Sequence, residues 1–330
     1  MKVWDTMGKI LVTNASFAKY SKKAEEILID YGLEIVRPNK PINDENDILE
    51  YLDGVVAIIT GLEPITKKVI SNASKLKVIG KHGIGVDNID MKYCDKHNIQ
   101  VTFTPLANGQ AVAEHALYLM FACSRNVNII NKYFREGRDF QVRNRYNSVE
   151  LQGKTVGIFG LGRIGRALAR MCNGIGMEVI GYDPYMLQNQ LSSDIELIKE
   201  KDEVLKRSDY ISIHLPCSDE TRGLIGFREF ELMKKSAFLV NTSRGGVVVE
   251  KDLIEALEKE MIRGAGIDVF EIEPVEASNP LFEMENVIVT PHLAGGSEEA
   301  IYKMSLHAAM GIDEFFSGKP LSWPVNKISF

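Results

Sequence analysis

Short hydrophobic segments rich in valine and isoleucine alternate with helical patterns along the first third of the chain. These segments are KILVTN, LEIV, GVVAIIT, LKVIGKHG and IQVTFTP, and all of them lie between residues 9 and 105. Strands buried on both faces of a parallel sheet are near-continuous apolar runs, and helical patterns connect them. The first third of the chain is therefore predicted to form a parallel α/β sheet.

A second series of the same kind starts at Gly153. Its apolar segments are TVGIFG, MEVIGYD, YISIHLP, AFLVNTS, GAGIDVF and NVIVTPH. Six such strands suit one complete dinucleotide-binding sheet. Because 330 residues exceed the usual size of a single core, we expect two α/β domains.

Two helical patterns stand outside these series. Residues 107–136 read as one long helix that begins with the nearly all-apolar stretch AVAEHALYLMFACS, so it is expected to be buried on most sides. Residues 138–150 are polar without a sustained period and are predicted to be an arm or a crossing segment. Near the C-terminus, SEEAIYKMSLHAAMGIDEFFSG predicts an amphipathic helix.

Composition narrows the class of protein. The formal net charge of -6 gives no general attraction for nucleic acid. The four cysteines lie far apart without metal-ligand spacing, so we expect reduced thiols, no disulfide framework and no metal site. The first residues, MKVWDTMGK, lack the apolar core of a signal peptide, and no apolar run is long enough to span a bilayer. A cytoplasmic enzyme or binding protein is expected.

A glycine motif, Gly160-x-Gly162-x-x-Gly165, directly follows a predicted strand and opens a predicted helix. In a dinucleotide-binding loop the first glycine permits the tight turn, the second lets the pyrophosphate approach, and the third lets helix and strand pack closely. The helix N-terminus then presents free N–H groups to the phosphates. The loop, including Arg163 and Ile164, is predicted to bind a dinucleotide.

Asp183 ends the next predicted strand, eighteen residues after Gly165. A carboxylate there accepts hydrogen bonds from the adenosine ribose and repels a ribose phosphate, which favours NAD over NADP. The alternative is a solvated turn residue before Pro184.

Three ionisable residues follow predicted strands of the second series, namely Arg244, Glu273 and His292. The carboxyl ends of parallel strands share the sheet edge that carries the glycine loop, so we expect these side chains to be neighbours. Singly, they have ordinary interpretations as a surface cation, a loop carboxylate and a core histidine. Jointly, they supply an anion clamp, an orienting carboxylate and a proton-transfer group. Asp268 is a weaker candidate for contacting the nicotinamide amide.

With these residues the sequence resembles the D-isomer-specific 2-hydroxyacid dehydrogenase family. The resemblance is carried, in chain order, by KHGIGVDNID, NGQAVAEHAL, LQGKTVGIFGLGRIG, YDP, HLP, NTSRGG, GIDVFEIEP and PHLAGG, while residues 1–75 carry little of it. It implies two doubly wound parallel-sheet domains with the active site in their cleft. A Rossmann NAD-binding domain, residues 107–300, would be inserted in a flavodoxin-like substrate domain, residues 1–106 and 301–330.

The resemblance also implies roles for individual residues. Arg244 would bind the carboxylate and keto oxygen of the substrate, His292 would be the acid/base, and Glu273 would pair with His292. The substrate carboxylate would be held by backbone N–H groups around His82, Gly83 and Ile84. Positive charge at Lys81 and His82 is compatible with a phosphorylated substrate without requiring one. Further cofactor contacts are expected at Pro216, Thr242 and Asn108, although a helix N-cap explains Asn108 equally well.

The predicted function is NAD-dependent interconversion of a D-2-hydroxy acid and its 2-keto acid, of the phosphoglycerate or glycerate/hydroxypyruvate/glyoxylate type. The alternative is an NAD(H)-sensing, corepressor-like binding protein of the same fold. The expected partners are the small-molecule acid and a second copy of the chain, through the helix at 111–124 and the arm at 138–150. Neither a nucleic acid nor a membrane partner is expected.

Overall fold

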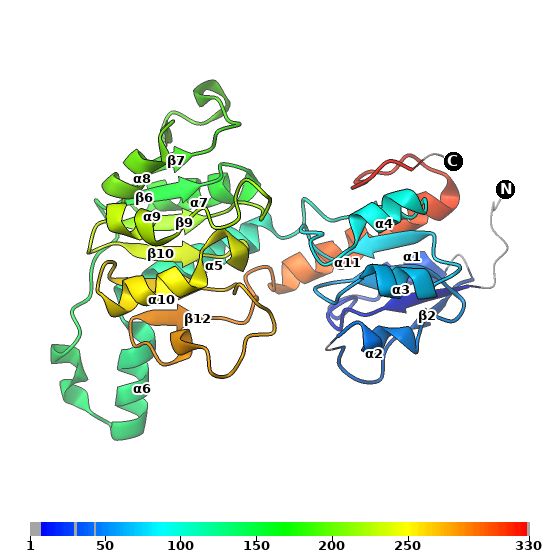
Figure 1. Cartoon of the computed structure of the whole chain (residues 1–330), viewed down its shortest axis with the longest axis horizontal. Helices are drawn as coiled ribbons and strands as arrows, with labels where there is room; N and C mark the ends of the chain where they lie inside the picture. Colours follow the sequence, from blue (N-terminus) through cyan, green and yellow to red (C-terminus); the bar gives the residue numbers. More distant parts are fainter. Residues whose placement is uncertain (1–7, 30–31, 43, 329–330) are drawn as a thin grey trace. The chain divides into compact units, whose positions relative to one another are not determined.

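The computed structural model describes residues 8–29, 32–42 and 44–328, and it divides into two compact units (Figure 1). Unit 1 comprises residues 1–108 and 296–330, and unit 2 comprises residues 109–295. The predicted domain boundaries lay at 106 and 300. Residues 1–7, on which the expectation about a signal peptide rests, lie outside the described residues.

Unit 1 contains a five-stranded sheet in which every neighbouring pair is parallel. In spatial order the strands are β2 (Glu34–Val36), β1 (Lys9–Val12), β3 (Val55–Thr60), β4 (Val78–Lys81) and β5 (Gln100–Thr102). The order 2-1-3-4-5 is that of flavodoxin-like folds. The predicted strands and the predicted flavodoxin-like class are therefore confirmed for this unit.

Helices cover both faces of this sheet, which explains why its strands are mostly apolar. One face packs against α1 (Lys23–Ile29) and α11 (Glu298–Ser317), and the other against α2 (Asn46–Leu49), α3 (Lys67–Asn72) and α4 (Met91–Lys96). Along β1, Ile10 faces the α1/α11 side and Leu11 faces the opposite side. Gly80 lets α11 approach β4, because a Cβ there would lie 3.2 Å from the carbonyl oxygen of Ala308.

Unit 2 contains a seven-stranded, all-parallel sheet. In spatial order the strands are β12 (Val287–Val289), β11 (Gly264–Ile267), β10 (Phe238–Asn241), β9 (Tyr210–Ile213), β6 (Thr155–Phe159), β7 (Glu178–Tyr182) and β8 (Glu196–Leu197). Read from β8, this is the 3-2-1-4-5-6 order of a Rossmann sheet extended by one strand. The strand β8 was not predicted, because its two residues form no apolar run.

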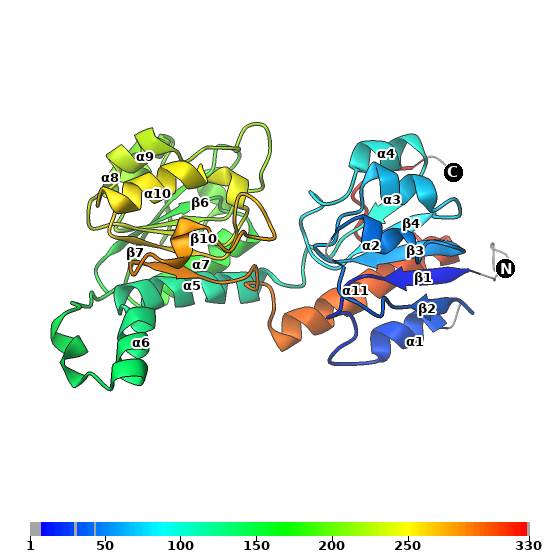
Figure 2. The ribbon, with the colours of Figure 1, turned by 60° about the horizontal axis from the view of Figure 1, so that its bottom comes forward.

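The two faces of this sheet are also covered (Figure 2). One face packs against α5 (Gly109–Ser124) and α7 (Arg163–Gly174), and the other against α8 (Lys201–Arg207), α9 (Phe227–Leu232) and α10 (Glu250–Glu258). Short 3-10 turns are η2 (Gln188–Gln190), η3 (Gly245–Val247) and η4 (Pro280–Phe282). The doubly wound architecture predicted for this part of the chain is confirmed.

The prediction of one long helix over 107–136 is wrong. The structure has two helices, α5 and α6 (Val127–Gly137), because Asn126 adopts a left-handed conformation with φ of 52°. Asparagine tolerates this conformation better than most residues, and here its side-chain amide donates to the carbonyl of Asn147. In Figures 1 and 2, α6 projects from the body of unit 2 and leads to η1 (Phe140–Asn144), within the predicted arm.

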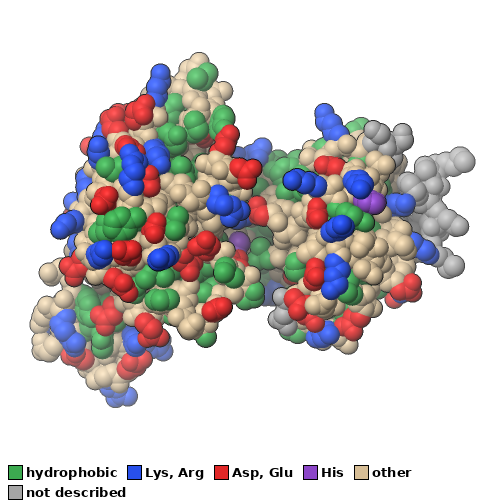
Figure 3. All heavy atoms as spheres, viewed as in Figure 1, with side chains coloured by type: hydrophobic (Ala, Val, Ile, Leu, Met, Phe, Trp, Pro, Cys, Tyr) green, Lys and Arg blue, Asp and Glu red, His purple; other side chains and the backbone are tan. Residues whose placement is uncertain are grey.

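The remaining chemical expectations concern metals, thiols and membranes. Among the described residues, no cluster of three or more His, Cys, Asp or Glu is placed to hold a metal ion, and no helix has the length and hydrophobicity to cross a bilayer. All four cysteines are free. Burial raises the pKa of the thiols of Cys94, Cys123 and Cys172 to about 12, so they are protonated at neutral pH. Figure 3 shows acidic and basic side chains interspersed over the visible surface.

Candidate active site

The glycine motif of unit 2 runs from the end of β6 into the first turn of α7, as predicted, and two of its three glycines have a steric reason. Gly160 has φ of 92°, and a Cβ there would lie 2.6 Å from the carbonyl oxygen of His214. A Cβ on Gly165 would lie 2.0 Å from the carbonyl oxygen of Gly160, so only glycine permits this packing of α7 against β6. At Gly162 nothing lies within 4 Å of the Cβ position, which leaves the backbone open to a ligand.

Asp183 follows β7 and lies next to this loop. Its Oδ2 accepts the N–H of Leu161 at 2.9 Å, and its Oδ1 accepts the N–H of Tyr185 at 3.0 Å. The carboxylate is therefore fixed beside the glycine loop, where each oxygen retains a second lone pair. The neighbouring Tyr185 donates its hydroxyl to Glu220 at 2.5 Å, which links the loops after β7 and β9; this contact was not predicted.

The other predicted cofactor residues have different surroundings. Thr242 is buried after β10, and its Oγ1 has no hydrogen-bond partner among the described residues. The same holds for Oδ1 of Asn108, which precedes α5, so this oxygen does not cap the helix. Pro216 is exposed after β9, and its carbonyl accepts the hydroxyl of Thr221. Buried polar atoms without partners suit a site that binds a polar ligand, and within unit 2 Thr242 and the open glycine loop fit a dinucleotide.

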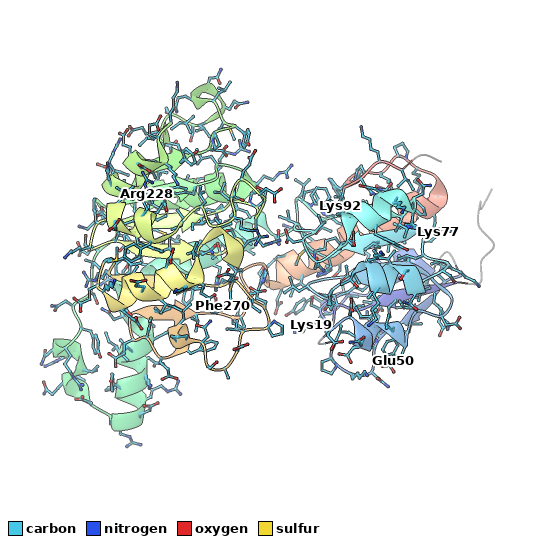
Figure 4. The ribbon with its side chains drawn as sticks, viewed as in Figure 1. Lys19, Glu50, Lys77, Lys92, Arg228 and Phe270 are labelled. Carbon is cyan, nitrogen blue, oxygen red and sulfur yellow. The ribbon has the colours of Figure 1, made fainter. Side chains whose placement is uncertain are left out.

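Glu273 and His292 form the predicted pair. His292 follows β12, and its Nδ1 lies 2.7 Å from Oε2 of Glu273. The other oxygen, Oε1, accepts the N–H of Phe270 at 3.0 Å; Phe270 lies in the segment after β11 and is labelled in Figure 4. Because its own loop holds one oxygen, the carboxylate is oriented before it meets the imidazole.

The electrostatics of Glu273 favour its ionised form. Burial raises the pKa of this carboxyl, whereas the hydrogen bond and the charge of His292 lower it. The N–H of Phe270 and the charge of Arg244 act in the same direction, and the pKa lies below its ordinary value. An ionised Glu273 stabilises a protonated imidazole at His292.

Arg244 lies at the start of η3, in the segment after β10. A Cβ on Gly245 would lie 1.9 Å from the carbonyl of Phe270, so this glycine lets the segment pack directly against the one that carries Glu273. One guanidinium nitrogen of Arg244 donates to the carbonyl of Ser243 at 2.7 Å. The structure thus brings the three predicted residues Arg244, Glu273 and His292 to one edge of the sheet.

Asp268, the weaker candidate for contacting the nicotinamide amide, contacts the segment around His292. Its side chain is fully buried, with 0% exposed, and its carboxylate accepts the N–H groups of Leu293 and Ala294, each at 2.9 Å. The hydroxyl of Thr290 donates to it at 2.5 Å. These contacts hold the segment around His292, and a contact of Asp268 with the nicotinamide amide stays a prediction.

In unit 1, the predicted carboxylate loop follows β4. The N–H of His82 donates to the carbonyl of Thr60 at 2.8 Å and continues the sheet, so it is not available to a substrate. The N–H groups of Gly83 and Ile84 make no hydrogen bond to the described part of the chain. Gly83 has φ of 153°, which favours glycine, and its carbonyl accepts both the N–H and the hydroxyl of Thr104. Two of the three predicted donors are thus open.

The two cationic candidates of this loop point into the protein. The ammonium of Lys81 is buried and donates to the carbonyl of Gly61 and to Oδ1 of Asn88, the latter at 2.6 Å. Burial lowers the pKa of His82 to about 4, so this imidazole is neutral at pH 7, and its Nε2 lies 3.0 Å from the hydroxyl of Ser305. Neither side chain presents a positive charge to solvent.

Comparison with known proteins gives the family. The model of the D-isomer specific 2-hydroxyacid dehydrogenase, NAD binding domain, matches residues 117–294, which lie within unit 2. The chain belongs to the D-isomer specific 2-hydroxyacid dehydrogenase family. Unit 2 is accordingly a nicotinamide-dinucleotide-binding domain, as the glycine loop predicted.

Two relatives illustrate the range of the family. The D-3-phosphoglycerate dehydrogenase of Methanocaldococcus jannaschii is 39% identical over 299 residues, which cover 89% of this chain and 55% of that protein. The glyoxylate reductase of Korarchaeum cryptofilum is 35% identical over 302 residues, which cover 91% of this chain and 90% of that protein. The chain therefore spans about half the length of the first relative and most of the second.

Solved structures agree with this assignment. A glyoxylate reductase from Paecilomyes thermophila superposes with a TM-score of 0.83 at 27% identity and covers 97% of this chain and 99% of its own. An acyclic imino acid reductase in complex with NADPH and D-Arg gives a TM-score of 0.83 at 28% identity, covering 96% of this chain and all of its own. These relatives are named as enzymes, which does not favour the alternative of a corepressor-like binding protein.

Proposed function

We propose that the protein is an NAD-dependent dehydrogenase that interconverts a D-2-hydroxy acid and its 2-keto acid. The observation that carries this proposal is the 2.7 Å hydrogen bond between Glu273 and His292, at the strand ends that also carry Arg244 and the glycine loop. The glyoxylate reductase and phosphoglycerate dehydrogenase names of the relatives support it.

The proton-transfer step is assigned to His292. A nicotinamide cofactor held by the glycine loop and Asp183 would supply or accept the hydride. Reduction of a keto group leaves an alkoxide that needs a proton, and His292 gives it from Nε2, since Nδ1 is engaged by Glu273. Glu273 orients the ring and stabilises its protonated form. The guanidinium of Arg244, which stays charged, is suited to bind the carboxylate and keto oxygen.

We further propose NAD rather than NADP as the cofactor, and a small substrate without a phosphate group, such as glyoxylate or hydroxypyruvate. Asp183 supports the cofactor choice, because its fixed carboxylate would repel a ribose phosphate. The substrate choice rests on unit 1, where the N–H groups of Gly83 and Ile84 suit a carboxylate. The ammonium of Lys81, which could have bound a phosphate there, is turned inward and engaged, and the imidazole of His82 is neutral.

Rates of NADH oxidation with glyoxylate, hydroxypyruvate and phosphohydroxypyruvate test the proposal. The expected result is turnover with the first two acids at a higher kcat/KM than with the third. A preference for phosphohydroxypyruvate would contradict the substrate choice and favour a phosphoglycerate dehydrogenase. Tight NADH binding without turnover of any acid would contradict the enzyme and favour the sensor.

A homodimer formed through α5, α6 and η1 and a cytoplasmic location complete the proposal. Large apolar side chains are exposed on these elements, namely Tyr118 (48%), Phe121 (38%), Phe134 (49%) and Phe140 (60%). Contact with a second copy would remove this surface from water. Four unpaired thiols suit a reducing compartment.

A further inference from the structure

His292 has an unusual backbone that its surroundings must enforce. Its φ is 50°, in the left-handed region that residues other than glycine rarely adopt. A backbone of this kind persists only where neighbouring contacts hold it, and it aims a side chain that an ordinary turn would direct elsewhere. The groups that hold this segment therefore decide where the imidazole of His292 points.

Asp268 makes most of the contacts that hold this segment. Its carbonyl oxygen accepts the N–H of His292 at 2.8 Å, and its carboxylate accepts the next two N–H groups, those of Leu293 and Ala294. The carboxylate also accepts the hydroxyl of Thr290 at 2.5 Å. One buried aspartate thus binds four residues of the segment 290–294.

A second histidine, His115 of α5, lies close to both Thr290 and Asp268. Its Nε2 is 3.1 Å from Oγ1 of Thr290 and 3.6 Å from Oδ1 of Asp268, and its side chain is 13% exposed. The hydroxyl of Thr290 has one proton, which it donates to Asp268, so it can only accept from His115. His115 must therefore carry its proton on Nε2, and the chain of donors runs from His115 through Thr290 to Asp268.

We infer that His115 is a positioning residue for the proton-transfer segment: by donating to Thr290, it fixes the hydroxyl on Asp268 and thereby the orientation of His292. This inference rests on the proposed dehydrogenase function. His292 and His115 lie on different elements. His292 follows β12, whereas His115 lies on α5, which packs against β11 and β12 and contacts Thr290 in the segment after β12. Removal of His115 leaves Thr290 free to rotate away from Asp268 and loosens the left-handed turn.

The charged and titratable groups around the segment allow a readout that a purely structural role would not change. They are Arg244 after β10, Glu273 in the segment after β11, and Asp268 and His115, which contact the segment 290–294. Burial lowers the pKa of His115 while the charge of Asp268 raises it, and the net direction is downward. When His292 is misaligned with Glu273, its protonated form loses support, so reduction should fail at a lower pH than in the native protein.

The test compares three variants in the full chain. His115→Leu removes the donor, Thr290→Val removes the link, and His115→Gln retains an amide N–H at nearly the reach of Nε2. With glyoxylate and NADH, we expect kcat to fall about 10- to 100-fold in the first two variants, with little change in NADH affinity. The alkaline limb of the pH profile should move to lower pH. His115→Gln should recover most of the rate, and the double variant should lose no more than either single one.

His307→Leu is the matched control, because it removes a half-buried histidine of α11 in unit 1, whose ring lies 4.3 Å from the ring of Trp323. It should leave the pH profile unchanged. Full activity with an unmoved profile in both His115→Leu and Thr290→Val, or additive losses in the double variant, would overturn the inference.

A second measurement separates this inference from the proposed function. If the native protein reduces no 2-keto acid, the proposed function fails, and hydrogen exchange of the amides of Leu293 and Ala294 then tests the positioning role without turnover. Faster exchange in His115→Leu, with native exchange in His307→Leu, supports the role of His115. Unchanged exchange in His115→Leu would overturn it.

Discussion

Glu273 divides its two carboxylate oxygens between its own loop and the imidazole of His292. Although burial opposes ionisation, its partners hold the pKa below the ordinary value. A carboxyl whose pKa is lowered in the folded state stabilises the fold at pH values above its ordinary pKa. This stabilisation is lost as the pH falls through the pKa of the folded state. The Glu273 carboxylate is therefore available to pair with His292 from mildly acidic pH upward.

Replacing Glu273 with glutamine tests this pairing. An amide holds the ring without stabilising its charge, so the pH at which reduction is half lost should move downward. Initial rates of NADH oxidation across the pH range measure the shift. Glu271→Gln, which changes a carboxylate of the same loop that contacts Glu250, is the control and should leave the profile in place. An unmoved profile in Glu273→Gln would mean that the pair is structural.

We predict that the preference for NAD over NADP depends on the carboxylate of Asp183. Asp183→Ala should lower the preference for NADH over NADPH by about 1–3 kcal/mol, because ribose hydrogen bonds and phosphate repulsion are lost together. The ratio of the two kcat/KM values measures the effect. Asp219→Ala, at an exposed carboxylate of the loop after β9, should leave that ratio unchanged. Equal native efficiencies, or a preference unaltered in Asp183→Ala, would contradict the assignment.

The positions of some functional side chains could be predicted from the sequence, and those of others could not. Arg244, Glu273 and His292 could be predicted to meet, because each follows a strand of one parallel sheet. The contacts of Asp268 could not be predicted, since they depend on the left-handed turn at residue 292. The inward direction of Lys81 likewise depends on the loop after β3, whose carbonyl it binds. The one signal for His115 was a histidine within a helix that is apolar on most sides.

At the scale of secondary structure, the strands were predictable because buried parallel strands must be apolar along their whole length. The strand β8 could not be predicted, because a strand of two residues at a sheet edge needs no apolar run. The break between α5 and α6 could not be predicted, because the apolar pattern continues across Asn126 although the backbone is left-handed there. The spacing of hydrophobic residues indicates which positions are buried. It does not reveal a single residue with a left-handed backbone.

The glycine loop gives a test at the same scale. Gly165→Ala should destabilise the fold and abolish NADH binding, because its Cβ would meet the carbonyl oxygen of Gly160. Gly174→Ala, at the end of the same helix with open space around the Cβ position, should be neutral or slightly stabilising. Thermal unfolding and NADH titration measure both effects. Native NADH affinity in Gly165→Ala would contradict the role of the loop.

At the scale of the whole molecule, two parallel sheets account for both units, and a surface of aromatic side chains remains on α5, α6 and η1. We expect the protein to be a dimer through this surface. Light scattering at micromolar concentration should give twice the chain mass of 36.9 kDa. Phe140→Asp should shift the equilibrium toward the monomer, and Tyr185→Asp, at an exposed aromatic residue near Asp183, should not. A monomer mass for the native protein would contradict the dimer.

The most direct test of the central claim is the turnover of His292→Ala with a 2-keto acid. We predict that its kcat for reduction falls on the order of 100- to 10,000-fold while its NADH affinity stays nearly native, because the glycine loop and Asp183 are untouched. Such a separation of binding from turnover would identify His292 as the acid/base of a dehydrogenase. Native turnover in His292→Ala would contradict the account.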